Sequence, residues 1–215
     1  MDDKFLRQAI IDELDFQPNI DPAHIGVAVE AGVVTLTGHV GSYAEKFAAE
    51  EAVKHVKGVK AIAQNIEVRY PNDKKTSDDE IAKRAIEILD WDVSIPSEGI
   101  QVKVQKGWIT LSGEVEWHHQ KLAAESAMRK LSGVMGVFNH ILIKSGIESG
   151  DVKKRIEEAL KRNAEVEAEQ IHVFVSKGAV TLEGKVKSWY ERELAERAAW
   201  AVRGVQTVTD RIQIS

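Results

Sequence analysis

An internal repeat runs through the 215 residues of this chain. Displacing the first third by 75 residues places it on the second third, and displacing the second third by 71 residues places it on the last, without a gap inside any copy. The best-matched segment reads Gly-x-x-x-Leu-x-Gly-x-Val and begins at Gly32, Gly107 and Gly178. Self-similarity at a fixed spacing indicates one structural unit that is built several times. We therefore predict three tandem domains, at residues 1–70, 77–145 and 149–215.

Each copy carries the hydrophobic periods of two helices and three strands. The opening segment places apolar residues four apart, as on one face of an amphipathic helix, and the next two segments alternate with a period of two, as half-buried strands do. A second helix follows with a face of small residues, and then a last strand. In the first copy these residues are Leu6, Ile10 and Leu14; Ile25, Val27 and Val29; Val34, Leu36 and Val40; Ala49, Ala52 and Val56; and Ile62, Ile66 and Val68. Their counterparts in the later copies include Ala127, Ala198 and Ile214.

Nine glycines recur at three positions of the repeat. The first position should supply the positive φ of a tight hairpin turn. The second lies inside a strand and predicts a bulge or the close approach of another backbone, which we expect to be that of a helix. The third stands where a glycine would end the second helix. The three sets are Gly32, Gly107 and Gly178; Gly38, Gly113 and Gly184; and Gly58, Gly133 and Gly204.

The order of these segments is helix, strand, strand, helix, strand. Ser42 and Glu45 fit a capping box at the start of the second helix, whereas the second copy has Trp117 and Gln120 at these positions. Two helices can cover one face of a small sheet, which is a stable two-layer arrangement. We therefore predict an α+β protein of three tandem αββαβ modules, each a three-stranded mixed sheet with two helices on one face.

Composition limits the function. The formal net charge is -5, and nonspecific binding to nucleic acid needs clustered Lys and Arg. The chain has no cysteine, which excludes disulfides, thiolate catalysis and Cys-based zinc sites. No apolar run reaches the roughly 20 residues of a membrane-spanning helix. The first residues lack the basic segment and apolar core of a secretory signal, so we expect a cytoplasmic protein, or a periplasmic one if a signal peptide has been removed.

The αββαβ order, the Gly-x-x-x-Leu-x-Gly-x-Val signature and the Gly-Val pair after the second helix resemble the BON (bacterial OsmY and nodulation) domain. The resemblance covers nearly the whole chain, at about 70 residues per copy. It implies a non-enzymatic binding protein, related to osmotic stress and the cell envelope, that engages phospholipid or membrane surfaces. Well-known members carry two such domains behind a signal peptide, whereas this chain has three. The family has no agreed catalytic residues to transfer.

The sequence predicts no catalytic, cofactor or metal site. His118 and His119 are the only close pair among seven histidines, and neighbouring residues on a helix point about 100° apart. The segment from Gly133 to Gly136 matches the GxxG loop with which KH domains clamp nucleic acid, but the other copies lack the second glycine and a helix end explains Gly133. We therefore predict neither an enzyme nor a nucleic-acid partner.

The outer face of the middle sheet is the first candidate contact surface. On this face the second copy carries Trp108, Phe138 and Leu142, whereas the first and third copies carry mainly small and polar residues. An exposed apolar cluster usually marks a contact surface. It would serve either packing against neighbouring copies or binding of a protein, a lipid or a second chain.

Aromatic residues near the start of the second helices form another candidate surface. Trp117, Trp189 and Tyr190 belong to it, and Arg192 lies beside them in an Arg-rich third copy. Rings with a polar edge suit membrane and protein interfaces alike, although plain solvation of a helix surface is the simpler interpretation.

Three hypotheses follow from these surfaces. The first is binding of phospholipid or a membrane surface, and the second is a protein-interaction or chaperone-like scaffold that uses the outer face of the middle copy. The third is small-ligand binding between modules. Salt should weaken a peripheral electrostatic contact with lipid but not an apolar contact with protein.

Overall fold

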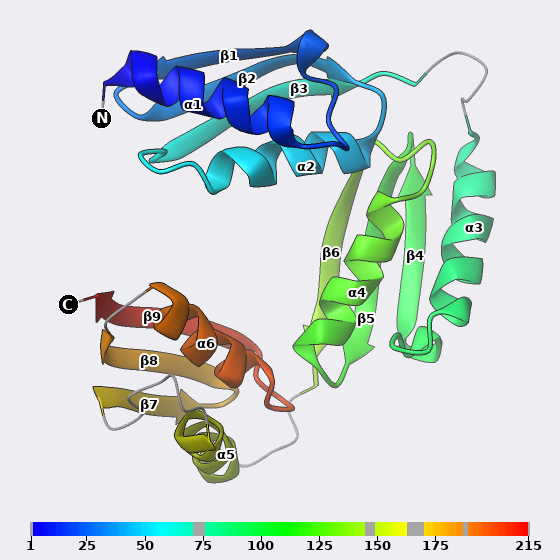
Figure 1. Ribbon diagram of the computed structural model, residues 1–215. Helices are drawn as coiled ribbons and strands as arrows, with labels where there is room; N and C mark the ends of the chain where they lie inside the picture. The colour runs from blue at the N-terminus through cyan, green and yellow to red at the C-terminus, as the bar shows by residue number, and fades with distance from the viewer. Residues whose placement is uncertain (1, 71–75, 145–148, 163–169, 187–188, 215) are drawn as a thin grey trace. The chain divides into compact units, whose positions relative to one another are not determined.

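The computed structural model describes residues 2–70, 76–144, 149–162, 170–186 and 189–214 of the chain. They form three αββαβ modules, as the repeat predicts (Figure 1). Module 1 contains α1 (Asp3–Phe16), β1 (Ile25–Glu30), β2 (Val33–Val40), α2 (Tyr43–Lys54) and β3 (Ala61–Val68). Module 2 contains α3 (Asp78–Trp91), β4 (Ile100–Gln105), β5 (Trp108–Val115), α4 (His118–Arg129) and β6 (Gly136–Ile143). Module 3 contains α5 (Ser149–Arg162), β7 (Ile171–Ser176), β8 (Ala179–Val186), α6 (Trp189–Trp200) and β9 (Thr207–Ile214).

Each sheet has its second strand in the centre. In module 1, β1 pairs antiparallel with β2, and β2 pairs parallel with β3, so that Val34 stands beside both Val29 and Ile62. Module 3 repeats this register, with Val180 beside Val175 and Val208. A parallel pair needs a crossover connection, which α2 and α6 provide. The predicted mixed α+β fold is confirmed.

The core of each module lies between the sheet and its two helices. In module 1 it joins Leu6, Ile10 and Leu14 of α1 to Ala49 of α2 and Leu36 of β2, all of them almost fully buried. Near the end of the second helix, Ala52 is buried as predicted, but the buried face also includes one residue in each module that was not predicted. Val53, Met128 and Ala199 are buried there, whereas Val56, Ala127 and Ala198 are only partly buried. Ile214, predicted to be buried in the last strand, is 38% exposed.

Both residues of each hairpin turn have positive φ. In module 1 they are Ala31 at 52° and Gly32 at 81°, which match the mirror-image turn preferred by two-residue hairpins. The carboxylate of Asp3 accepts hydrogen bonds from both turn amides, at 2.7 Å from Ala31 and 3.1 Å from Gly32. Asp78 serves the amides of the second turn in the same way. The first residue of the opening helix thus fixes the hairpin on which the sheet is built.

The in-strand glycines allow a very close backbone approach. A Cβ atom on Gly113 would lie 1.9 Å from the carbonyl oxygen of Gly99, and one on Gly38 would lie 1.9 Å from that of His24. Both carbonyls belong to short 3₁₀ turns, Ser97–Gly99 and Pro22–His24, that lead into the first strand of their modules. The predicted close approach is present, but the neighbour is this turn and not one of the α-helices.

The second helices of modules 1 and 2 start with side-chain caps. Ser42 accepts a hydrogen bond from the amide of Glu45 at 3.1 Å, and the Glu45 carboxylate accepts one from the amide of Gly41 at 3.0 Å. Module 2 lacks the serine but keeps the reciprocal half, because the Gln120 side chain accepts from the amide of Trp117 at 3.1 Å. Both starts are therefore capped despite their different sequences.

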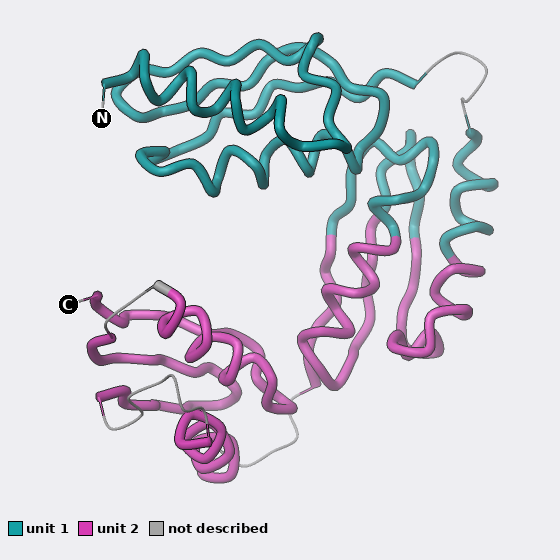
Figure 2. Tube along the Cα trace, in the orientation of Figure 1, with its two compact units in different colours: residues 1–85, 103–109, 128–138 teal, residues 86–102, 110–127, 139–215 magenta. Residues whose placement is uncertain are grey.

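Two compact units divide the chain within module 2 (Figure 2). The first consists of residues 1–85, 103–109 and 128–138, and the second of residues 86–102, 110–127 and 139–215. One end of module 2 thus belongs with module 1 and the other end with module 3.

Candidate functional site

Trp108 and Phe138 form a stacked aromatic pair on the outer face of the middle sheet. Their ring centroids lie 5.0 Å apart with an interplanar angle of 18°. Trp108 is 42% exposed and Phe138 is 49% exposed, although both carry large apolar rings. The corresponding positions hold Val33 and Ala63 in module 1, and Ala179 and Thr209 in module 3. The pair is therefore a feature of the middle module.

Gly136 makes room for the indole ring of Trp108. A Cβ atom at this position would lie 2.2 Å from Cζ3 of that ring. Module 1 has Ala61 and module 3 has Thr207 in place of Gly136. In these modules Val33 and Ala179 stand in place of Trp108, so no large ring needs the space. By sequence, Gly136 stands out only as part of a possible KH loop. The joint appearance of Trp and Gly at these two positions in one copy was the signal for this packing.

Two exposed lysines belong to the hairpin of module 2 that carries Trp108. Lys103 is exposed and belongs to the strand next to β5, and Lys106 is exposed in the hairpin turn. Further along the outer face of β6 lie His140 and Leu142, of which Leu142 is 63% exposed. This surface, which we call the aromatic face, thus combines flat apolar rings with a basic rim.

The aromatic residues near the starts of the second helices differ in their surroundings. Trp117 is half-buried and lies 5.9 Å from the ring of His119, whereas Tyr190 is 54% exposed. Arg192 forms an ion pair with Asp210 at 2.5 Å, in which Asp210 is only 13% exposed. The side chain of Trp189 lies outside the described residues. The charge of Arg192 is therefore already compensated within its own module.

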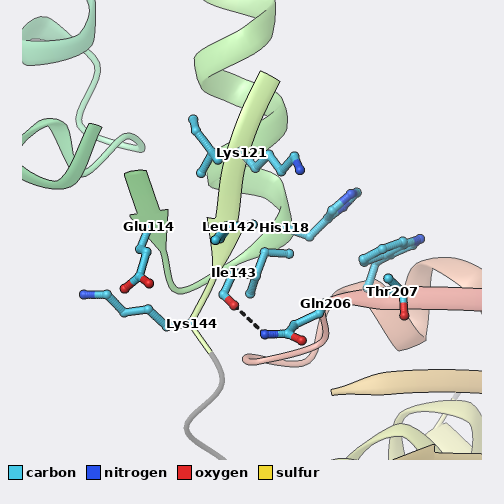
Figure 3. Close-up of a pocket in the computed structure, with 10 residues that line it drawn as sticks. Glu114, His118, Lys121, Leu142, Ile143, Lys144, Gln206 and Thr207 are labelled. Carbon is cyan, nitrogen blue, oxygen red and sulfur yellow. Dashed lines mark hydrogen bonds between the residues drawn. The ribbon is translucent and has the colours of Figure 1, made fainter. Parts of the chain in front are cut away.

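A cavity of about 710 Å³ lies in the second compact unit (Figure 3). Its walls include Glu114, His118, Lys121, Leu142 and Trp200. The His118 ring stacks on the Trp200 indole with centroids 3.7 Å apart. Burial lowers the pKa of His118 below its ordinary value, and the positive charges of Lys121 and His119 lower it further. Sequence reasoning gave no position for this cavity, because its walls come from segments far apart in the chain.

The described part of the chain contains no group of three or more His, Asp or Glu side chains arranged to hold a metal ion. Nor is any helix within these residues both long enough and apolar enough to cross a membrane.

These modules define the chain as a member of the BON domain family. The BON domain matches residues 2–70, 77–145 and 149–215, which together span nearly the whole sequence. The described glycine turns, helix ends and mixed sheets recur in each match.

Within this family, the chain is similar to a particular protein. Osmotically-inducible protein Y of Escherichia coli (strain K12) is 31% identical over 153 residues, which are 67% of this chain and 74% of that protein. Two solved structures of CdsD, a structural protein of the type III secretion system of Chlamydia trachomatis, align at 17% and 16% identity with TM-scores of 0.28. They cover 98% and 100% of this chain, and 92% and 100% of their own.

Proposed function

We propose that this protein is a non-enzymatic, stress-related binding protein that engages phospholipid surfaces through its BON domains. The link to stress rests on its relationship to a protein named for osmotic induction. The observation that carries the binding proposal is the aromatic face of module 2, where the stacked pair of Trp108 and Phe138 is exposed beside Lys103 and Lys106.

Chemistry favours a membrane surface as the partner of this face. Indole rings concentrate at the boundary between lipid and water, where one part of the ring is apolar and another is wet. Lysines near an anionic leaflet contribute about 1 kcal/mol each, and salt screens this contribution. The aromatic face offers both features, in contrast to Arg192 of module 3, whose charge is paired with Asp210.

Co-sedimentation with liposomes tests the proposal. The full chain should pellet with vesicles that contain phosphatidylglycerol, less so at physiological salt, and little with pure phosphatidylcholine. Trp108→Asp should abolish pelleting, because it places a charge in the apolar contact. Phe174→Asp is the matched control, since Phe174 is a 54% exposed aromatic residue on the outer face of module 3.

Two results would contradict lipid binding through this face. One is the absence of pelleting under every condition, and the other is equal pelleting of the Trp108→Asp variant and the wild-type chain. Circular dichroism of both variants must show an intact fold for either result to count.

A protein partner is the second candidate for the same face. Clusters of ordered aromatic side chains are typical anchor points of protein interfaces. A protein-interaction or chaperone-like scaffold would give complexes or self-association that persist at high salt. If Trp108→Asp dissociates such an assembly and the wild-type protein does not bind vesicles, the results support the scaffold function instead of lipid binding.

A further inference from the structure

The cavity of the second compact unit has the size of a small-molecule site. Ligand pockets in proteins typically enclose about 300–1,000 Å³, and this one encloses about 710 Å³. In Figure 3, His118 and Lys121 extend from α4, Leu142 and Ile143 come from β6, and the dashed line joins Gln206 to the carbonyl oxygen of Ile143. That hydrogen bond of 2.9 Å joins the last residue of β6 to the residue before β9, and both residues line the cavity.

One side of the cavity is apolar. Leu142 is 63% exposed and lines the cavity, whereas the side chain of the next residue, Ile143, is buried on the other face of the strand. The stacked rings of His118 and Trp200 supply a flat surface on the same cavity. An apolar chain or ring could lie here and remove these groups from water.

Lys121 provides the positive charge of the cavity wall. The cations at the same position of the other two modules already have partners, which sets Lys121 apart. The same repeat position holds Lys46, whose ammonium group donates to the carbonyl of Ile66 at 2.7 Å, and Arg192, which is paired with Asp210. Both of these cations serve structure inside their own modules.

In module 2 the anionic partner is missing. Asn139 stands where Asp210 stands in module 3, and its amide group donates to the backbone carbonyl of Lys121 at 2.9 Å and to Glu125 at 3.0 Å. Within the described residues, the ammonium group of Lys121 forms neither a hydrogen bond nor an ion pair, and it lines the cavity. Lys144 also lines the cavity, and Glu114 is the one carboxylate among the residues that line it. The charged groups of the cavity wall are thus predominantly positive.

We infer that this cavity binds a monomeric amphipathic anion, with its carboxylate on Lys121 and its apolar part against Leu142 and Trp200. This site shares Leu142 with the aromatic face but includes neither Trp108 nor Phe138, and it does not depend on lipid-surface binding. A ligand with a single negative charge is sufficient, because one cation, Lys121, provides the main ionic contact.

Isothermal titration calorimetry of the full chain with octanoate tests the site. Octanol shares the apolar chain without the charge, and inorganic phosphate shares the charge without the chain, so both should bind far more weakly than octanoate. Lys121→Gln should weaken octanoate binding by about tenfold, as expected for the loss of a charge-assisted hydrogen bond. Lys103→Gln makes the same change of charge on the aromatic face and should leave octanoate binding unchanged.

The position of the ligand has its own readout. Octanoate should shift the NMR signals of the His118 ring and of the Trp200 indole N–H. Trp108→Asp should leave octanoate binding intact even if it abolishes vesicle binding, which separates this proposal from the proposed function. The inference is overturned if octanoate does not bind at millimolar concentration, or if Lys121→Gln binds it as well as the wild-type chain does.

Discussion

Gly113 illustrates how a single residue decides whether a module can fold. Its φ is 124°, and a Cβ atom would collide with the carbonyl oxygen of Gly99 at 1.9 Å. A backbone neighbour cannot move aside as the end of a side chain can. We therefore expect Gly113→Ala to destabilise the protein by about 3 kcal/mol or more in chemical denaturation.

Gly150→Ala is the matched control for this substitution. Gly150 lies in helix α5, and nothing would contact its Cβ atom within 4 Å. Alanine is favoured over glycine in helices, so the control should be as stable as the wild-type chain or slightly more stable. If the two variants unfold at the same denaturant concentration, the close approach at Gly113 does not restrict the fold.

Gly136 makes a different prediction, because its close neighbour is a side chain. In Gly136→Ala the new methyl group would displace the indole of Trp108, which lies at the surface and can rotate. We expect a small loss of stability, below about 1 kcal/mol, together with loss of the stack on Phe138. Near-UV circular dichroism should report the change in the Trp108 environment, and an unchanged spectrum would show that the glycine is not needed for the stack.

At the level of elements, the carboxylate of Asp78 links the start of α3 to the turn between β4 and β5. It accepts hydrogen bonds from the amides of Lys106 at 2.7 Å and Gly107 at 2.8 Å. Asp78→Ala leaves both amides without these acceptors and should cost about 1–3 kcal/mol. Amide hydrogen exchange at Lys106 and Gly107 should accelerate.

Asp79→Ala provides the comparison for this element. Asp79 is the next residue of the helix, is exposed, and forms its ion pair with Lys83 only at 3.9 Å. Its removal should leave the exchange of the turn amides unchanged. Equal protection of Lys106 and Gly107 in Asp78→Ala and in the wild-type chain would mean that the turn conformation does not need the carboxylate.

The elements themselves were predictable because their signals are local. Periods of two and about four residues, glycines at turns and the repeat gave the helices, the strands and the fold class. The bond from Asp3 to Gly32 spans 29 residues and leaves no local pattern, so it was not foreseen. The residues of the aromatic face could be predicted from the alternation of the strands alone. The packing of Trp108 over Gly136 could not, because it depends on the register of β5 and β6.

Each compact unit contains a contact between the second helices of neighbouring modules, and the later module uses the same repeat position in both. In the first compact unit the guanidinium of Arg129 lies 3.5 Å from the ring centroid of Phe47. In the second unit the residue corresponding to Arg129 is Trp200, and it stacks on His118. Each contact places the end of a second helix on the second helix of the preceding module. The change of residue type explains why a comparison of the three copies did not reveal it.

The stack of His118 on Trp200 makes the stability of the second compact unit depend on pH. Burial, followed by the charges of Lys121 and His119, lowers the pKa of His118 in the folded chain below its ordinary value of 6.5. The unfolded chain therefore binds more protons as pH falls through 6.5, and the free energy of unfolding decreases until the folded pKa has been passed. Above 6.5 the imidazole is neutral in both states, and this contribution vanishes.

NMR titration of the His118 ring should accordingly give a pKa below 6.5, and acid should shift the fluorescence of Trp200 as the stack loosens. His118→Phe keeps an aromatic ring at this position but cannot take up a proton, so it should remove this part of the pH dependence while preserving the contact. The other charged groups of the cavity, Glu114, Lys121 and Lys144, are unchanged in that variant and control for general charge effects. A His118 pKa at or above 6.5, or the same acid response in His118→Phe, would show that burial against Trp200 does not govern the protonation of this residue. Octanoate bound at Lys121 would place a negative charge close to His118 and should raise its pKa, so the same titration links the pH response to the cavity.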